Sequence, residues 1–278
     1  VCGPRMAIGS YDAQFPEGFD PNYFPGDART FAGAFAATAT AEAAAPVAND
    51  DELDALLRTF DFDTSTDAEV ERIEEIVFRD LRKEAAELAS SWLTQGLVQR
   101  VLLTHASLPE ALAALPSGKL HAELPGTLKY SQVDGSRAES ATAEEALRST
   151  MARVFQGAAV RRAVVSDLIK VLVVDPAADG LLQPFLFFKG FHALATHRVA
   201  HSLWCDGTPA SRGAALMLQS RSAELFALDL HPAATIGNGV MLDHGTGIVI
   251  GSTAVIGSDV YMLHGVTLGA TGKPTGGK

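Results

Sequence analysis

Residues 230–271 read LHPAATIGNGVMLDHGTGIVIGSTAVIGSDVYMLHGVTLGAT, and an aliphatic residue opens a new unit at almost every sixth position. These opening residues are Leu230, Ile236, Leu242, Ile250, Ile256, Met262 and Leu268. Helices repeat every 3.6 residues and strands every 2, so neither element by itself explains a period of six. The pattern predicts a parallel β-helix, in which short strands stack around a shared apolar core.

The repeat is interrupted once, by two additional residues between Leu242 and Ile250. The interruption follows directly after Asp243 and His244. In a solenoid, an insertion out of phase with the repeat forms a loop outside the regular face, and functional residues concentrate in such loops. We therefore expect a functional site at this loop.

The composition is that of a globular protein with an acidic surface. The chain of 278 residues has a net charge of −11, which argues against nucleic acid or an anionic membrane as the main partner. Its two cysteines, Cys2 and Cys205, form neither a disulfide framework nor a zinc-binding spacing, and the apolar run before Cys205 predicts a buried thiol. No stretch approaches the roughly 20 apolar residues that a membrane-spanning helix needs. We expect a soluble protein of the cytoplasm, with a plastid or mitochondrion as the alternative.

Composition also divides the chain into three parts. Residues 1–65 are rich in Pro, Gly and Ala and predict a disordered extension or a linker. Residues 66–228 predict a helical domain, which begins at the capping box Thr66-Asp67-Ala68-Glu69 and continues as a helix over residues 70–103. Further helices are expected over residues 141–174, 185–204 and 214–226, the first ending at Asp175-Pro176. The apolar stripe of the first helix includes Ile73, Ile76, Val77, Leu81, Leu88, Trp92 and Leu93.

Residues 229–278 complete the predicted architecture. The fold class is α+β, with an all-helical amino-terminal domain followed by a left-handed parallel β-helix of about two coils. An open last coil exposes apolar core and unpaired strand edges, and natural solenoids cap that end. We therefore expect the polypeptide to continue past Lys278.

Several motifs follow one another in the second half of the chain. They are Asp175-Pro176-Ala177, Lys189-Gly190-Phe191-His192-Ala193-Leu194, His197-Arg198-Val199-Ala200-His201, Asp229-Leu230-His231-Pro232-Ala233-Ala234, Leu242-Asp243-His244-Gly245-Thr246-Gly247 and Val266-Thr267-Leu268-Gly269. A hexapeptide repeat alone indicates acyltransferases in general, whereas this ordered series is far more specific. By these motifs the chain resembles the serine O-acetyltransferases, above all their plant-like members.

The resemblance implies acetyl transfer from acetyl-CoA to the hydroxyl of L-serine in cysteine biosynthesis, with acetyl-CoA as co-substrate and neither a resident cofactor nor a metal. It assigns the general base to His244 and the carboxylate that orients this base to Asp229. Asp175 and Asp243 would surround the ammonium group of serine, because opposite charges attract. An imidazole with a pKa of about 6.5 suits proton removal near neutral pH, and a carboxylate on its other nitrogen fixes the tautomer.

The chain also departs from the family in two places. Gly269-Ala270 stands where the family has paired glycines, so a cofactor contact there that requires positive φ would be disfavoured by about 1 kcal/mol. The Arg-His-Pro motif that completes the serine pocket, and the tail that docks into O-acetylserine sulfhydrylase, would follow Lys278. We expect little activity from this chain alone. The whole protein would bind the sulfhydrylase and form a homotrimer or a hexamer.

Each candidate residue also has a structural interpretation. His244 could be a polar corner of the solenoid, Asp229 and Asp175 could cap neighbouring elements, and Asp243 could be a solvated turn residue. His192, His197 and His201 fit packing better than metal binding, because no acid or cysteine completes a ligand set.

Three other functions stay open at this point. A hexapeptide-repeat acetyltransferase with a sugar or xenobiotic acceptor would use the same solenoid. A zinc carbonic anhydrase would need His231, His244 and His264 to converge on one metal. A non-catalytic paralogue would regulate an active enzyme through the helical domain.

Overall fold

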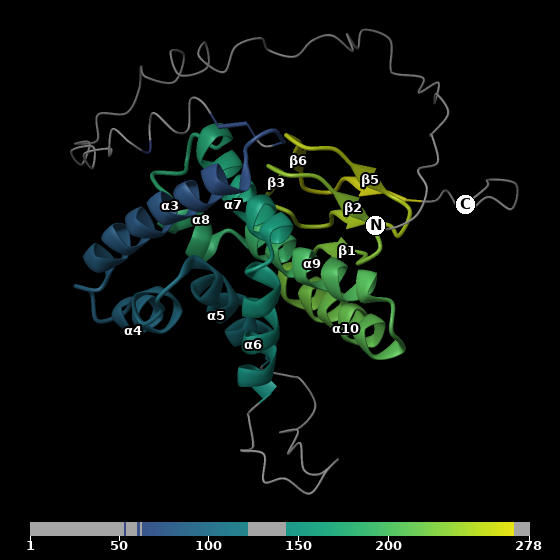
Figure 1. The fold of residues 1–278 in the computed structure, drawn as a ribbon, viewed down its shortest axis with the longest axis horizontal. Helices are drawn as coiled ribbons and strands as arrows, with labels where there is room; N and C mark the ends of the chain where they lie inside the picture. Colours follow the sequence, from purple (N-terminus) through teal and green to yellow (C-terminus); the bar gives the residue numbers. More distant parts are fainter. Residues whose placement is uncertain (1–52, 54–59, 62, 122–142, 270–278) are drawn as a thin grey trace, which may run out of the picture. The chain divides into compact units, whose positions relative to one another are not determined.

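The computed structural model describes residues 53, 60, 61, 63–121 and 143–269, and helices precede short strands along them (Figure 1). Most of the predicted extension at residues 1–65 and of the loop predicted near residues 121–140 lies outside the described residues. The same is true of Ala270 and of the end of the chain. The helices are α3 (Asp67–Leu88), α4 (Gln95–Val98), the π-helical turn η1 (Gln99–Leu103), α5 (Leu108–Leu120), α6 (Ala143–Phe155), α7 (Ala158–Val174), α8 (Leu182–Phe187), α9 (Lys189–Asp206) and α10 (Pro209–Phe226). None of these described helices combines the length and apolarity that crossing a membrane requires.

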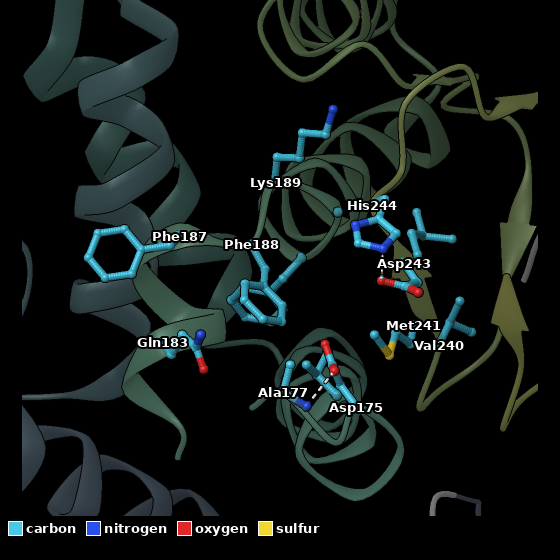
Figure 2. Close-up of a pocket in the computed structure, with 14 residues that line it drawn as sticks. Asp175, Ala177, Gln183, Phe187, Phe188, Lys189, Val240, Met241, Asp243 and His244 are labelled. Carbon is cyan, nitrogen blue, oxygen red and sulfur yellow. Dashed lines mark hydrogen bonds and ion pairs between the residues drawn. The ribbon is translucent and has the colours of Figure 1, made fainter. Parts of the chain in front are cut away.

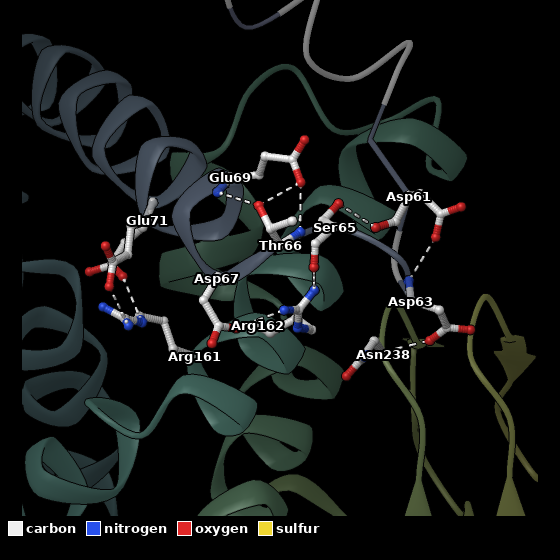
Figure 3. A network of polar contacts seen from close by, with 11 residues as sticks. Asp61, Asp63, Ser65, Thr66, Asp67, Glu69, Glu71, Arg161, Arg162 and Asn238 are labelled. Carbon is white, nitrogen blue, oxygen red and sulfur yellow. Dashed lines mark hydrogen bonds and ion pairs between the residues drawn. The ribbon is translucent and has the colours of Figure 1, made fainter.

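The predicted capping box starts α3. The Thr66 side chain accepts a hydrogen bond from the Glu69 amide at 3.3 Å, and the Glu69 carboxylate accepts one from the Thr66 amide at 2.6 Å (Figure 3). The predicted continuation to residue 103 is wrong, because α3 ends at Leu88. Hydroxyl groups beyond this point bond to the last carbonyl groups of the helix and compete with further turns, as Ser90 does with the Glu87 carbonyl at 2.7 Å. Trp92 therefore leaves the apolar stripe and is 87% exposed.

The later helices are shorter than the sequence pattern suggests. The run predicted over residues 141–174 divides at Gly157, and the run over 185–204 divides at Phe188. The predicted end at Asp175 is confirmed, since Asp175 leaves helical geometry directly before Pro176. Helix α5 was not predicted; it starts with Pro109 in its first turn, where proline is tolerated.

Seven short strands form the solenoid. They are β1 (Asp229–Leu230), β2 (Thr235–Ile236), β3 (Met241–Asp243), β4 (Val249–Ile250), β5 (Val255–Ile256), β6 (Tyr261–Leu263) and β7 (Thr267–Leu268). All pairs are parallel, in the orders β1-β4-β7, β2-β5 and β3-β6. Leu230 pairs with Ile250 across 20 residues, whereas Ile250 pairs with Leu268 across 18. The predicted two-residue slip is thus confirmed, as is the predicted order of a helical part and a left-handed parallel β-helix.

The buried apolar residues form two cores. One is formed by the helices, and the other by the inward aliphatic residues of the solenoid. Ala193 and Leu194 of α9 belong to the solenoid core, so α9 joins the two parts (Figure 1). Gly190 permits this contact, because a Cβ at that position would lie 1.9 Å from the carbonyl oxygen of Leu242.

A buried ion pair fixes α7 and α9 to the first coil. Arg198 donates to both carboxylate oxygens of Asp167, at 3.0 and 2.9 Å, and to the carbonyl groups of Ile236 and Gly237, each at 2.6 Å. The Asp167 carboxylate also accepts from the Val240 amide at 2.9 Å. These bonds satisfy both charges, which is the condition under which a buried pair is tolerated.

A second, more exposed set of polar contacts lies where α3 begins (Figure 3). Arg162 of α7 donates to Asp67 at 2.8 Å. Asp63, just before α3, accepts from Ser258 of the second coil at 2.6 Å. The start of the helical part is therefore connected to α7 and to the solenoid.

Candidate active site

A cavity of about 440 Å³ opens between α7, α8, α9 and strand β3 (Figure 2). Its lining residues are Val171, Asp175, Ala177, Gln183, Phe187, Phe188, Lys189, Gly190, Phe191, Val240, Met241, Leu242, Asp243 and His244. Three of the four residues predicted for catalysis and serine binding thus meet in one cavity: Asp175, Asp243 and His244. They come from the end of α7 and from the interrupted repeat, which are far apart in the sequence.

The two additional residues of the first coil give His244 an unusual backbone. His244 has a φ of +55°, and Gly245 and Gly247 follow with φ of +64° and +76°. A non-glycine residue in this left-handed region is strained, and such strain is concentrated at functional sites. The imidazole is 75% exposed and stands at the mouth of the cavity.

Contacts from both sides hold this loop. The Gly247 amide donates to the Ala227 carbonyl at 2.8 Å, and the Gly265 amide of the next coil donates to the Thr246 carbonyl at 2.9 Å. Lys189, at the start of α9, donates to the hydroxyl of Thr246. The loop is therefore fixed between the helices and the second coil, with Lys189 adding a positive charge to the lining.

Asp243 lies between two functional groups. Its Oδ1 is 3.8 Å from Nε2 of His244, and its Oδ2 accepts a hydrogen bond from the Tyr261 hydroxyl at 2.7 Å. Burial, followed by this hydrogen bond and the charges of Asp243 and Asp175, raises the pKa of Tyr261 to about 12. The phenol therefore remains a proton donor at neutral pH.

The sequence prediction did not include Tyr261, although the register of the repeat indicates its position. Once the two-residue slip is allowed for, Tyr261 pairs with Met241, two residues before Asp243 on the same strand face. Side chains two positions apart on a strand point to the same side. The diagonal neighbour of Asp243 in the next coil could therefore have been identified.

Asp175 enters the cavity from the end of α7. One of its oxygens accepts a hydrogen bond from the Ala177 amide at 2.9 Å, which orients the carboxylate in the turn that Pro176 forces (Figure 2). Two carboxylates, Asp175 and Asp243, thus face the same space and make it attractive to a small cation such as an ammonium group.

Asp229 does not line this cavity. It accepts a hydrogen bond from the Gln219 amide group at 2.6 Å, and among the described residues the carboxylate within ion-pair distance of His244 is that of Asp243. The orienting role of Asp229 stays a prediction. Gly269 is the last described residue and Ala270 lies beyond it, so their cofactor contacts also stay predictions.

Three histidines of α9 have packing roles. His192 is buried, with Nε2 bonded to the Phe185 carbonyl at 2.8 Å and Nδ1 to the Lys119 ammonium group at 3.1 Å. Burial lowers the pKa of His192 and of His197 to about 3. His201 bonds to the Pro232 carbonyl at 2.8 Å. The predicted packing roles are thus confirmed.

The histidines required for a zinc anhydrase do not converge. The His244 and His264 rings are 6.1 Å apart between centroids, while His231 packs against Trp204. Among the residues that the structure describes, no group of three or more metal-binding side chains could hold an ion. The prediction of a buried Cys205 is wrong, because the thiol is exposed in the last turn of α9, one residue before the helix ends at Asp206.

Comparison with known proteins agrees with this arrangement. Residues 77–196 match the family described as serine acetyltransferase, N-terminal. The chain is 42% identical over 197 residues to a probable serine acetyltransferase 4 of Oryza sativa subsp. japonica, covering 70% of this chain and 57% of the rice protein. It thus spans a little over half the length of that relative.

Two solved structures share the fold. Soybean serine acetyltransferase complexed with serine superimposes with a TM-score of 0.62 at 36% identity, covering 73% of this chain and 76% of the soybean chain. The enzyme of Brucella abortus strain S19 in complex with coenzyme A gives a TM-score of 0.61 at 34% identity, covering 72% and 73%. By its sequence and its fold, the chain belongs to the serine acetyltransferase family.

Proposed function

We propose that the protein containing this chain transfers the acetyl group of acetyl-CoA to the hydroxyl of L-serine, giving O-acetyl-L-serine for cysteine biosynthesis. The observation that carries the proposal is the meeting of Asp175, Asp243 and His244 in one cavity. Serine and coenzyme A appear in the names of structures of relatives, which supports these two substrates.

His244 is the base in this reaction. As the serine oxygen attacks the thioester carbon, His244 takes the hydroxyl proton, and the C–S bond breaks in the collapse of the tetrahedral intermediate. The imidazolium then returns a proton to the departing thiolate of CoA. An exposed imidazole at the mouth of a cavity can reach a small alcohol bound inside it.

Asp175 and Asp243 bind the acceptor through its ammonium group. Both carboxylates are already oriented by hydrogen bonds, at 2.9 Å from the Ala177 amide and 2.7 Å from the Tyr261 hydroxyl. A preoriented pair reduces the entropy lost when serine binds. Acceptors that lack an amino group, such as simple sugars, leave two facing carboxylates without a counterion and bind poorly.

Acetyl-CoA serves as a co-substrate in this proposal, bound along the solenoid near Gly269 and Ala270, and Asp229 supports the base.

Exposed apolar side chains on the coils, including Val255 at 69% exposure, support association of copies through the β-helix into a trimer or hexamer. The proposal also includes a partner, O-acetylserine sulfhydrylase, which docks to a carboxy-terminal tail. It places the protein in the cytoplasm, with import into a plastid or mitochondrion as the alternative. The mass of the full-length protein in solution tests the assembly.

The decisive experiment measures CoA release from acetyl-CoA by the full-length protein with L-serine as acceptor. Replacing His244 with Ala removes the base, which contributes about 10²- to 10⁴-fold to such reactions, so we expect kcat to fall by that factor. An equal rate in His244→Ala would exclude His244 as the base. Turnover of a sugar or xenobiotic in preference to serine would indicate another acetyltransferase, and no turnover with any acceptor would indicate a regulatory paralogue.

A further inference from the structure

Tyr261 reaches the proposed serine site from the second coil. Its hydroxyl donates to Oδ2 of Asp243 at 2.7 Å, although Tyr261 itself lies on strand β6 and is 44% exposed. The strand pairing that brings it there joins Met241 to Tyr261 and Asp243 to Leu263. The contact therefore depends on the register of the two coils and is not local in sequence.

Two groups compete for the carboxylate of Asp243. Tyr261 is bonded to Oδ2, while Nε2 of His244 lies 3.8 Å from Oδ1, too far for a hydrogen bond. If Asp243 turned fully onto Nε2, it would occupy the nitrogen that must face the serine hydroxyl and would stabilise the imidazolium form. The hydrogen bond from Tyr261 opposes that rotation.

We propose that Tyr261 is a positioning residue for the acceptor: its hydroxyl holds the Asp243 carboxylate where it receives the serine ammonium group and keeps it off Nε2 of His244. This inference rests on the proposed function. The raised pKa of Tyr261 agrees with it, because the phenol feels the charges of both Asp243 and Asp175. Asp175 and Asp243 then form the recognition side of the cavity, with Tyr261 supporting Asp243 from outside the lining, and His244 forms the reacting side.

The test replaces Tyr261 with Phe in the full-length protein, which removes the hydroxyl and keeps the ring. We expect KM for L-serine to rise about tenfold, which corresponds to about 1.4 kcal/mol, with a smaller change in kcat.

Two controls separate this role from a structural one. With 3-hydroxypropionate, which has the hydroxyl but no ammonium group and should bind poorly, wild type and Tyr261→Phe should have the same low kcat/KM. In an Asp243→Asn background, Tyr261→Phe should have little additional effect, because residues that act through one another are not additive. An unchanged KM for serine in Tyr261→Phe, or additive effects in the double variant, overturns the inference while leaving the proposed function intact.

A spectroscopic measurement tests the hydrogen bond between Tyr261 and Asp243, whether or not serine is the acceptor. The ultraviolet difference between wild type and Tyr261→Phe during alkaline titration isolates the ionisation of Tyr261. We expect it near the value of about 12 and expect Asp243→Asn to lower it toward the ordinary value of about 10. Absence of CoA release with serine would refute the proposed function, whereas ionisation of Tyr261 at the ordinary value in wild type would refute its bond to Asp243.

Discussion

At the scale of single residues, the site depends on positions where the backbone conformation or a close approach restricts which residue fits. His244 adopts a φ of +55° in the two-residue insertion, and Gly190 allows α9 to approach strand β3. The first residue was identified from the sequence, because the insertion and the motif around it coincide. The second was quoted only as part of a motif, because close approach of a helix to a strand has no signature in a single sequence.

Substitutions of two helical glycines should have opposite effects on stability. Gly190→Ala places a methyl group where the Leu242 carbonyl oxygen lies, so we expect a loss of about 1–3 kcal/mol in the free energy of unfolding, since overpacking costs this much. Gly213→Ala in α10 meets no atom within 4 Å and should stabilise by up to about 1 kcal/mol through helix propensity. Urea denaturation of both variants checks the pair, and a stable Gly190→Ala would show that α9 can move away from the solenoid.

At the scale of elements, the joint between the helices and the coils combines a buried ion pair with a surface one. Asp167 and Arg198 have side chains 1% and 7% exposed, and each makes bonds to more than one partner. Lys170 of α7 also pairs with Asp259 of the second coil, at 2.6 Å, but Asp259 is 63% exposed. Both pairs connect α7 or α9 to the solenoid, so they offer a matched comparison.

Removal of one buried charge should be much more damaging than removal of a surface charge. We expect Arg198→Met to lower the free energy of unfolding by about 3–5 kcal/mol, because Asp167 is left buried without a counterion. Asp259→Asn, which removes the exposed charge of the Lys170 pair, should change it by no more than about 1 kcal/mol. Chemical denaturation of the two variants measures the difference, and equal losses would contradict the importance of burial here.

The sequence predicted the positions of the strands more accurately than the ends of the helices, and the difference has a physical reason. Strand positions followed from the period of six, because each aliphatic residue must face the one core of the solenoid. Helix ends were less accurate: Trp92 and Leu93 continued the apolar pattern of α3, yet the hydroxyl groups around them ended the helix. Local side-chain competition of this kind is weak in sequence patterns and decisive in the structure.

At the scale of the whole molecule, acid should destabilise the chain through buried histidines. The folded-state pKa of His192, about 3, lies below the ordinary value of about 6.5, so the unfolded chain binds a proton that the folded chain excludes. The stability from the neutral imidazole is therefore fully present above pH about 6.5 and is lost as the pH falls toward 3. His197 acts in the same direction.

The pH dependence of unfolding tests this prediction. The free energy of unfolding of wild type, measured in urea, should decrease between pH 7 and pH 5. His192→Gln, which retains a donor for the Phe185 carbonyl, should reduce that decrease. A slope unaffected by His192→Gln would mean that other groups cause the acid sensitivity.

The sequence located the site better than it described the geometry of the site. Asp175, Asp243 and His244 were identified by resemblance and lie in one cavity. The carboxylate beside His244 is that of Asp243, and Asp229 is bonded to Gln219 instead. Side-chain rotamers and hydrogen-bond partners depend on three-dimensional packing, so a single sequence does not specify them.

The unequal lengths of the coils, 20 residues and then 18, have an evolutionary consequence. The two additional residues that displace His244 from the regular repeat are not needed for strand stacking, because the next coil closes without them. A descendant that lost two residues here would regain a uniform spiral and keep its inward aliphatic stacks. If His244 is the base as proposed, one short deletion would therefore abolish the reaction and leave the fold in place.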